Sequence, residues 1–361
     1  MKIGILTFHF GNNYGAVLQC YALLTVLKQL GYDPEIINYV YRFLPDNRVR
    51  RIKEKIKFQI QNGRIFSHFR KRFLTPISFA IKSDKDWSMI GTRYDVVIVG
   101  SDQVWRYKYT DYKIKHYFFD FVPDGIKKMS YAASFGVGEF EGNQTVIEKI
   151  KPLLARFNAI SVREKSGVEI CRSVFGFDAV HVLDPTMLLQ PEQYELISGE
   201  KTSKLKPPYI AYYFLDDHED KMKIIKECSA KTGIKKNISL LPKKKDFSYF
   251  MPPLLSFSDY TYPSVPEWLY RISNAEFVIT DSFHGTVFSI LFNKQFLCIG
   301  NEVRGLSRMN DLLTLFGLKN RLITETNFVF PESRIDYSPV NQILAQEREM
   351  SVKFLLKAIN L

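Results

Sequence analysis

The chain has 361 residues, of which 46% are hydrophobic, and a formal net charge of +12. This length exceeds that of a usual single domain, so we expect two domains, and the 29 Phe and 20 Tyr residues supply two cores without disulfides. No apolar run approaches the ~20 residues that span a bilayer, and the first residues read as a strand rather than a signal peptide. The four cysteines are scattered without metal-like spacing, so we expect a soluble protein in a reduced cytoplasmic compartment.

The chain opens with a predicted βαβ unit. Residues 3–7 read as a strand, 11–15 as a turn, 16–30 as a helix with apolar residues at helical spacing, and 35–39 as a second strand. Gly31 ends the helix. The turn lacks the GxGxxG spacing that a dinucleotide-binding loop requires.

Basic residues are concentrated in the next segment. Between Arg42 and Arg72 the only acidic residues are Asp46 and Glu54. This basic segment has three interpretations: a nucleic-acid patch, a face for anionic membrane lipids, or a solvated helical insertion. Because no nucleic-acid-binding motif accompanies the segment, we expect no nucleic-acid partner, and peripheral contact with the inner face of a membrane stays open beside plain solvation.

Strand and helix signals alternate through the rest of the chain. Strand-like runs occupy 94–99, 128–133, 159–162 and 179–183, and a Lys-rich stretch at 198–206 reads as a linker. A second series follows at 209–215, 238–241, 277–280 and 296–299, and 339–361 reads as helical. The pattern predicts an N-terminal α/β domain (1–200), a C-terminal α/β domain (207–335) and a helical segment (339–361), with two mostly parallel sheets facing each other across a cleft.

The most informative segment covers residues 277–286. An apolar strand stops at Asp281 and Ser282, which are good helix-capping residues, and His284 and Gly285 fall in the first turn of a new helix. The N-terminus of a helix attracts anions, so an imidazole placed there suits a proton-transfer role on an anionic substrate. The alternative is a helix cap that contains a surface histidine.

Several ordered motifs run through the chain: GNNYGA (11–16), YDVVIVGSDQVW (94–105), YAASFG (131–136), SVRE (161–164), LDPTMLL (183–189) and TDSFHGTVFSILFNKQFLCIG (280–300). Together they resemble the polysaccharide pyruvyl transferase family over most of the chain. The resemblance implies two Rossmann-like domains arranged as in glycosyltransferase-B enzymes. Characterised members move the enolpyruvyl unit of phosphoenolpyruvate onto a sugar, which becomes a cyclic pyruvate ketal in an exopolysaccharide, capsule, cell-wall polymer or glycan.

The resemblance also implies roles for residues of the C-terminal motif and of SVRE. It assigns the general acid to His284 and places Arg163 against the substrate anion, whereas a surface pair with Glu164 is the alternative for Arg163. In members from cell-wall and glycan pathways an Arg precedes the catalytic His by two positions; Ser282 stands there in this chain. Donor binding is therefore expected from the following set: Arg163, Ser282, Gly285 and, from the loop at 301–308, Arg304 or Arg308.

The N-terminal motifs fit an acceptor site. Asn12, Asn13 and Tyr14 could hydrogen-bond sugar hydroxyls, and Tyr14 or Trp105 could offer a stacking face. Asp102 could orient or deprotonate an attacking hydroxyl. The alternative for each of these residues is a structural role in a turn or a helix cap.

The resemblance predicts phosphoenolpyruvate as co-substrate, no further cofactor, and an oligosaccharide or lipid-linked saccharide as acceptor. No cluster of His, Cys and carboxylate residues indicates a metal. A nucleotide-sugar-dependent glycosyltransferase and a non-catalytic saccharide-binding protein are the other functions compatible with this architecture.

Overall fold

The computed structural model describes residues 1–39, 65–199, 205–216, 219–242, 262–300, 305–323, 329–331 and 333–361. Most of the basic segment, from Arg42 to Arg64, and the candidate donor ligand Arg304 lie outside these residues. The strands are β1 (Lys2–Leu6), β2 (Asp33–Ile36), β3 (Val96–Val99), β4 (Lys127–Ser130), β5 (Ser161–Val162), β6 (Val180–His181), β7 (Ile210–Tyr213), β8 (Asn237–Ser239), β9 (Phe277–Thr280), β10 (Gln295–Ile299) and β11 (Leu322–Ile323). The α-helices are α1 (Tyr14–Gln29), α3 (Ile65–Phe73), α4 (Asp84–Gly91), α5 (Tyr107–Thr110), α6 (Gln144–Leu154), α7 (Lys165–Ile170), α8 (Pro191–Ser198), α9 (Glu219–Thr232), α10 (Val265–Ser273), α11 (Phe283–Leu291), α12 (Leu306–Leu315) and α13 (Tyr337–Asn360).

The N-terminal half is built on a parallel sheet with strand order β2-β1-β3-β4. The predicted βαβ unit is confirmed, because β1 and β2 pair in parallel and α1 connects them. Strands β5 and β6 form a small parallel pair of their own, and isolated bridges such as Ala133 to Val162 tie it to the end of β4. The carboxyl ends of these strands therefore lie on one side of the domain.

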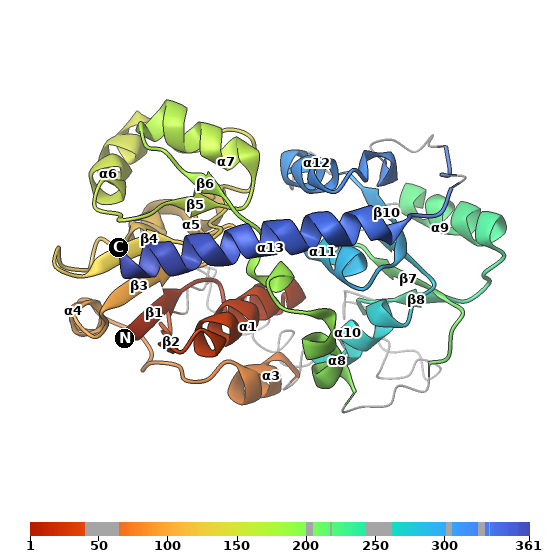
Figure 1. The fold of residues 1–361 in the computed structure, drawn as a ribbon, viewed down its shortest axis with the longest axis horizontal. Coiled ribbons are helices and arrows are strands. Elements are labelled where there is room, and N and C mark those ends of the chain that lie inside the picture. The colour runs from red at the N-terminus through yellow and green to blue at the C-terminus, as the bar shows by residue number, and fades with distance from the viewer. Residues whose placement is uncertain are drawn as a thin grey trace, which may run out of the picture.

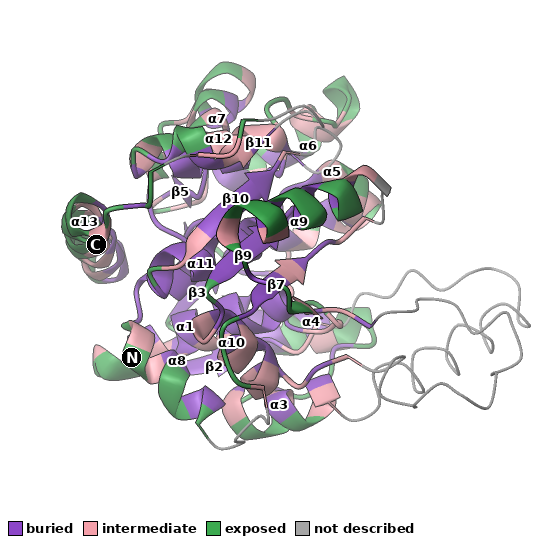
Figure 2. Cartoon of the chain, turned by 90° about the vertical axis from the view of Figure 1, so that its right-hand side faces the viewer, coloured by how far each residue is buried: buried purple, intermediate pink, exposed green. Residues whose placement is uncertain are grey.

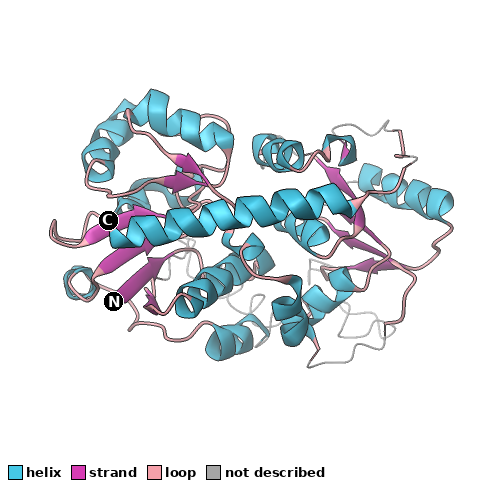
Figure 3. Cartoon of the chain, viewed as in Figure 1, coloured by secondary structure: helices cyan, strands magenta, loops and turns pink. Residues whose placement is uncertain are grey.

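The C-terminal half carries a second parallel sheet, with strand order β11-β10-β9-β7-β8. Strand β9 has the predicted bounds, and Ser282 begins α11 as its N-cap, accepting a hydrogen bond from the Gly285 N–H at 3.4 Å. Figures 1 and 3 show the two halves side by side, each with helices around its sheet. The predicted α/β class with parallel sheets is confirmed.

The C-terminal helix α13 crosses both halves. It begins beside the second domain and ends near the N-terminus of the chain (Figure 1). The Ile359 carbonyl accepts a hydrogen bond from Lys127 Nζ at 3.2 Å, and Ser351 Oγ accepts one from the Leu183 N–H at 3.0 Å. The predicted helical segment is thus a single strap that returns the chain to the first domain.

The chain passes from one half to the other earlier than residue 200. Helix α8 packs against α10, and the Tyr194 ring lies 5.0 Å from the ring of Phe288 in α11. The crossover segment is therefore the stretch 183–190, which includes the short 3-10 helix η3 (Pro185–Met187) and contacts α1.

The interface between the halves is apolar. The largest core cluster combines residues of α1 with residues of α8, α10, α11 and α13, whereas two smaller clusters lie in the outer parts of the two halves. Figure 2 shows the strands β3, β9 and β10 mainly as buried, and the outer face of α9 and parts of α13 as exposed. Domains joined through a large hydrophobic interface are expected to hold one relative orientation.

A glycine at the start of α1 allows the halves to approach closely. A Cβ atom on Gly15 would lie 2.0 Å from Nδ1 of His284, which comes from the other half. At Gly11, four residues earlier, a Cβ would meet nothing within 4 Å.

We expect Gly15→Ala to destabilise the protein although Ala is normally the better helix former by about 1 kcal/mol. The added methyl must displace the His284 ring, and such overpacking costs about 1–3 kcal/mol, which lowers Tm by several degrees. Differential scanning calorimetry checks this, with Gly11→Ala as the matched control. A Gly15→Ala protein at least as stable as wild type would contradict this packing.

Candidate functional site

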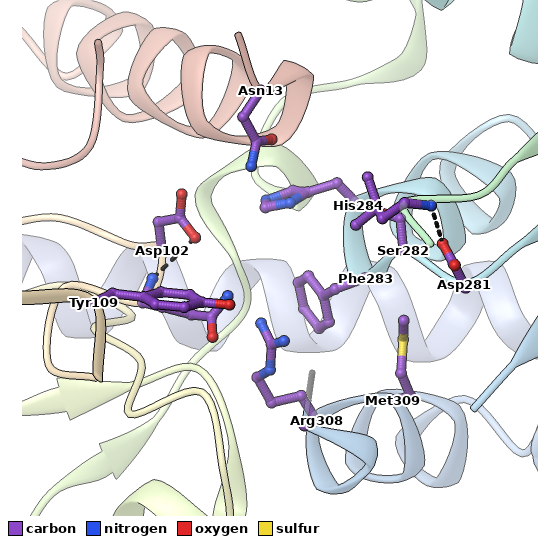
Figure 4. A pocket seen from close by; sticks show the side chains of 12 residues that line it. Asn13, Asp102, Tyr109, Asp281, Ser282, Phe283, His284, Arg308 and Met309 are labelled. Atoms are coloured by element: carbon purple, nitrogen blue, oxygen red, sulfur yellow. Dashed lines mark hydrogen bonds between the residues drawn. The ribbon is translucent and has the colours of Figure 1, made fainter. Parts of the chain in front are cut away.

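A cavity of about 260 Å³ lies between the two halves, at the carboxyl ends of β3 and β9 (Figure 4). Such strand ends are where α/β proteins place their ligands. The first half contributes Asn13, Asp102, Gln103 and Tyr109 to the wall, and the second half contributes Leu215, Asp281, Ser282, Phe283, His284, Gly305, Arg308 and Met309.

His284 lies in the first turn of α11 and is 7% exposed. Its Nε2 atom is buried and faces Oδ2 of Asp184 at 3.5 Å, which is within ion-pair range but longer than a good hydrogen bond. The other ring nitrogen, Nδ1, faces Gly15, and Figure 4 shows the ring beneath Asn13 at the cavity wall. The imidazole is therefore held by packing from both halves.

Asp184 is the buried counter-ion of this site. Its carboxylate accepts hydrogen bonds from Arg163 Nη1 at 2.7 Å, from Ser101 Oγ at 2.8 Å and from Thr186 Oγ1 at 2.7 Å. Burial by itself raises the pKa of this carboxyl, but the charges of His284 and Arg163 and the hydrogen bonds hold the pKa well below its usual range. The crossover segment thus carries a permanent negative charge next to His284.

Sequence reasoning missed Asp184. The residue stands in the LDPTMLL motif, but its sequence position lies 100 residues from His284, as their numbers show. The available signal was an acidic residue that directly follows an apolar strand-like run, which places it at the edge of a sheet where ligands bind.

Two arginines approach the ring of Phe283. The guanidinium carbon of Arg163 lies 4.3 Å from the ring centroid and that of Arg308 lies 5.6 Å from it. Arg308 lines the cavity, and burial together with the charge of Arg163 lowers its pKa to about 10. A bound anion would favour the charged form of this guanidinium, and Asp102 and Asp281 contribute carboxylates to the same wall.

Three predicted contacts with ligands are corrected by the geometry. Arg163 is not among the residues that line the cavity, and its guanidinium donates to Asp184 instead. The alternative of a surface pair with Glu164 is also wrong, since both side chains are buried. Tyr14 is fully buried, stacks on Trp268 at 4.9 Å and donates its hydroxyl to the Pro263 carbonyl. Trp105 is also fully buried, stacked on Phe118. Neither aromatic ring can stack on a sugar.

The remaining predicted residues divide into two groups. Asn13, Asp102, Ser282 and Arg308 line the cavity together with His284, and Asp102 adopts a left-handed backbone with φ 75°. Asn12 and Gly285 are not among the described lining residues; a Cβ on Gly285 would lie 2.2 Å from Thr280 Oγ1, so this glycine serves the packing of α11 on β9. The structure therefore brings candidates from both halves to one cavity.

The described residues lack two features. No group of three or more His, Cys, Asp and Glu side chains in that part of the chain is placed to hold a metal ion. None of the helices found there combines the length and the apolar character needed to cross a membrane.

The two parallel α/β domains form a glycosyltransferase-B-like fold. A UDP-GlcNAc 2-epimerase from Methanocaldococcus jannaschii shares this fold at a TM-score of 0.51 and 12% identity, over 99% of this chain and 100% of the other. The UDP-GlcNAc 2-epimerase from Neisseria meningitidis, whose structure was solved with UDP-GlcNAc bound, has a TM-score of 0.48 at 10% identity, over 99% of this chain and 100% of the other.

The sequence comparison identifies the family. The family model for polysaccharide pyruvyl transferase matches residues 13–303, which include most of both domains and the cavity residues from Asn13 to His284. The chain belongs to the polysaccharide pyruvyl transferase family. A comparison with curated proteins gave no match.

Replacing Asp184 by Asn should lower the stability by about 3–5 kcal/mol at pH 7, because it removes the carboxylate 2.7 Å from the buried Arg163 guanidinium and leaves the more distant Glu164, at 4.0 Å. The pKa of Asp184 is lower in the folded protein than the ~3.9 of an unfolded Asp. The contribution of the Asp184 charge to the free energy of unfolding is therefore complete above pH ~4, and it is lost as the pH falls through the pKa of the folded state.

Urea unfolding of wild type and Asp184→Asn from pH 8 to pH 3 checks both points, and the difference should shrink only below pH ~4. Asp178→Asn is the control, since the Asp178 side chain is 96% exposed. Equal midpoints for wild type and Asp184→Asn at pH 7 would remove Asp184 as the counter-ion.

Proposed function

We propose that this protein transfers the pyruvyl group of phosphoenolpyruvate to a sugar of a surface-polysaccharide precursor and forms a pyruvate ketal, with His284 as the general acid. The observation that carries the proposal is the coincidence, in one small cavity, of a buried arginine and a histidine at a helix N-terminus. Phosphoenolpyruvate is a small dianionic or trianionic molecule that needs fixed cations and N–H donors.

Arg308 is the proposed donor-binding cation. Family members from cell-wall and glycan pathways have an arginine at the position of Ser282. In this chain the Ser282 hydroxyl caps α11, so another residue must supply the guanidinium. Arg308 projects from α12 into the same cavity beside Phe283 (Figure 4). We assign Arg163 a positioning role, because it contacts Asp184 rather than the cavity.

The proposed reaction begins with proton delivery from His284 to the methylene carbon of phosphoenolpyruvate. The Asp184 carboxylate beside Nε2 complements the doubly protonated ring that an acid requires, and Nδ1 is the nitrogen on the side of Gly15 and Asn13. The methylene becomes a methyl group, and positive charge develops on the neighbouring carbon.

A sugar hydroxyl attacks that carbon, the bond to phosphate breaks, and a second hydroxyl closes the ketal ring. Of the two hydroxyl protons, one replaces the proton given to carbon and the other leaves with inorganic phosphate. The reaction is balanced without an oxidant, a metal or a further cofactor. Attack from the side of Asp102 and Asn13 places the acceptor on the first domain.

The acceptor class is an oligosaccharide or a lipid-linked saccharide. A lipid-linked acceptor would bring the enzyme to the inner face of a membrane, where the basic segment would favour anionic lipids. That contact stays a prediction, because most of this segment lies outside the described residues.

His284→Gln should reduce pyruvyl transfer by at least about 10²–10⁴-fold and leave the affinity for phosphoenolpyruvate nearly unchanged, because an acid acts in the transition state. Transfer from ¹⁴C-labelled phosphoenolpyruvate to acceptor glycan measures turnover, and calorimetric titration measures donor binding. His116→Gln is the control, as this histidine pairs with Asp120 away from the cavity. Substantial turnover by His284→Gln would exclude His284 as the acid.

Arg308→Ala should weaken phosphoenolpyruvate binding by roughly 10- to 150-fold, the usual loss for one charge-assisted contact. Arg304→Ala should be measured in parallel, and Arg334→Ala is the control because the side chain of Arg334 is 75% exposed. Phosphoenolpyruvate, but not UDP, should raise the Tm of the wild type. Stabilisation by UDP instead would favour a nucleotide-sugar-dependent glycosyltransferase on this fold.

A further inference from the structure

A second cavity, of about 320 Å³, opens on the first domain beside the one already described. It shares Asn13, Asp102 and Tyr109 with the first cavity, so the two spaces meet at these three residues. The other lining residues come from the loop after β1 (Phe8, His9, Phe10 and Gly11), from α1 (Ala16), from the segment after β2 (Tyr39), from α5 (Lys108) and from the 3-10 helix η1, Asp111–Phe118 (Tyr117).

Aromatic rings form most of the wall. The ring of Tyr117 lies 5.4 Å from that of Phe8 in an edge-to-face arrangement and 6.1 Å from that of Tyr39. The Arg70 guanidinium lies 4.7 Å from the centroid of Phe10 and donates to the Gly11 carbonyl at 3.1 Å, which supports the loop from the outside. The rings are thus held in place before any ligand arrives.

The polar groups are gathered at the junction with the first cavity. The Asp102 carboxylate accepts the Gln103 N–H at 2.9 Å through Oδ1, and Asn13 uses its Oδ1 to cap α1, which leaves its NH₂ group as a donor. His9 contributes apolar surface instead, because Thr7 and Asn38 engage both of its ring nitrogens. A ligand here would meet rings on its sides and hydrogen-bonding groups at one end.

We propose that this second cavity binds a single pyranose unit of the acceptor, with an apolar sugar face against the aromatic wall and the reacting hydroxyls directed at Asp102 and Asn13. A pyranose has this combination, since its axial C–H groups form apolar faces and its hydroxyls lie around the edge. The inference rests on the proposed function, because the donor in the first cavity must meet the acceptor at the junction.

Asp102 is the group that receives the hydroxyl proton. The carboxylate accepts this proton as the hydroxyl oxygen forms its bond to the central carbon of the donor, and the proton then leaves with phosphate. The backbone of Asp102 holds φ 75°, a conformation that costs non-glycine residues energy and is concentrated at functional sites. This conformation places the carboxylate at the wall of both cavities.

The test uses methyl glycosides of glucose, galactose, mannose and N-acetylglucosamine as probes, each observed by saturation-transfer difference NMR with the full chain. At least one probe should bind the wild type, with the strongest signals from ring C–H protons. Phe10→Ala should weaken that binding by about tenfold or more, because it removes one face of the aromatic wall. Phe10→Tyr should restore it, whereas Tyr112→Ala, at a 66% exposed ring outside the cavity, should leave it unchanged.

Phosphoenolpyruvate binding is measured on the same variants by thermal shift and should be equal in all of them. Glycoside binding that survives Phe10→Ala would overturn the assignment of this cavity. A wild type that binds phosphoenolpyruvate but none of the glycosides would overturn the single-pyranose pocket and leave the proposed donor chemistry standing. Glycoside binding without phosphoenolpyruvate binding would support the pocket and overturn the proposed function.

Discussion

The geometry of the site depends on the contacts of one buried carboxylate, that of Asp184. It lies in the crossover segment, bonds to Ser101 and Arg163 of the first domain, and faces His284 of the second. An ion taken out of water is tolerated only when partners satisfy it from several sides. Because Ser101 and Arg163 belong to the first domain and His284 to the second, this carboxylate lies where the two domains meet.

The interface around this carboxylate favours a preformed site. A continuous apolar cluster joins the domains, α13 straps them, and Gly15 lets the His284 ring approach α1. A histidine fixed in this way does not need to be ordered when substrate binds. Catalysis by fixed charges benefits from such preorganisation, because the reorganisation cost is met during folding rather than during the reaction.

The two adjoining cavities differ in chemistry in a way that fits a two-substrate transfer. The first presents a buried guanidinium and an imidazole, and the second presents mainly aromatic rings. Their shared residues, Asn13, Asp102 and Tyr109, all belong to the first domain. The family membership and the two adjoining cavities therefore support the proposed transfer.

The sequence by itself determined the alternation of strands and helices, the bounds of β9 and the capping of α11 by Ser282, because periodicity and capping depend on neighbours within a few residues. Only the tertiary structure decided that Asp184 meets His284, that Arg163 faces Asp184 rather than the cavity, and that Tyr14 and Trp105 are core residues. The local sequence around Tyr14 or Trp105 gives the same prediction whether the aromatic ring is exposed or buried. Burial and long-range pairing depend on how distant segments pack, which local pattern does not encode.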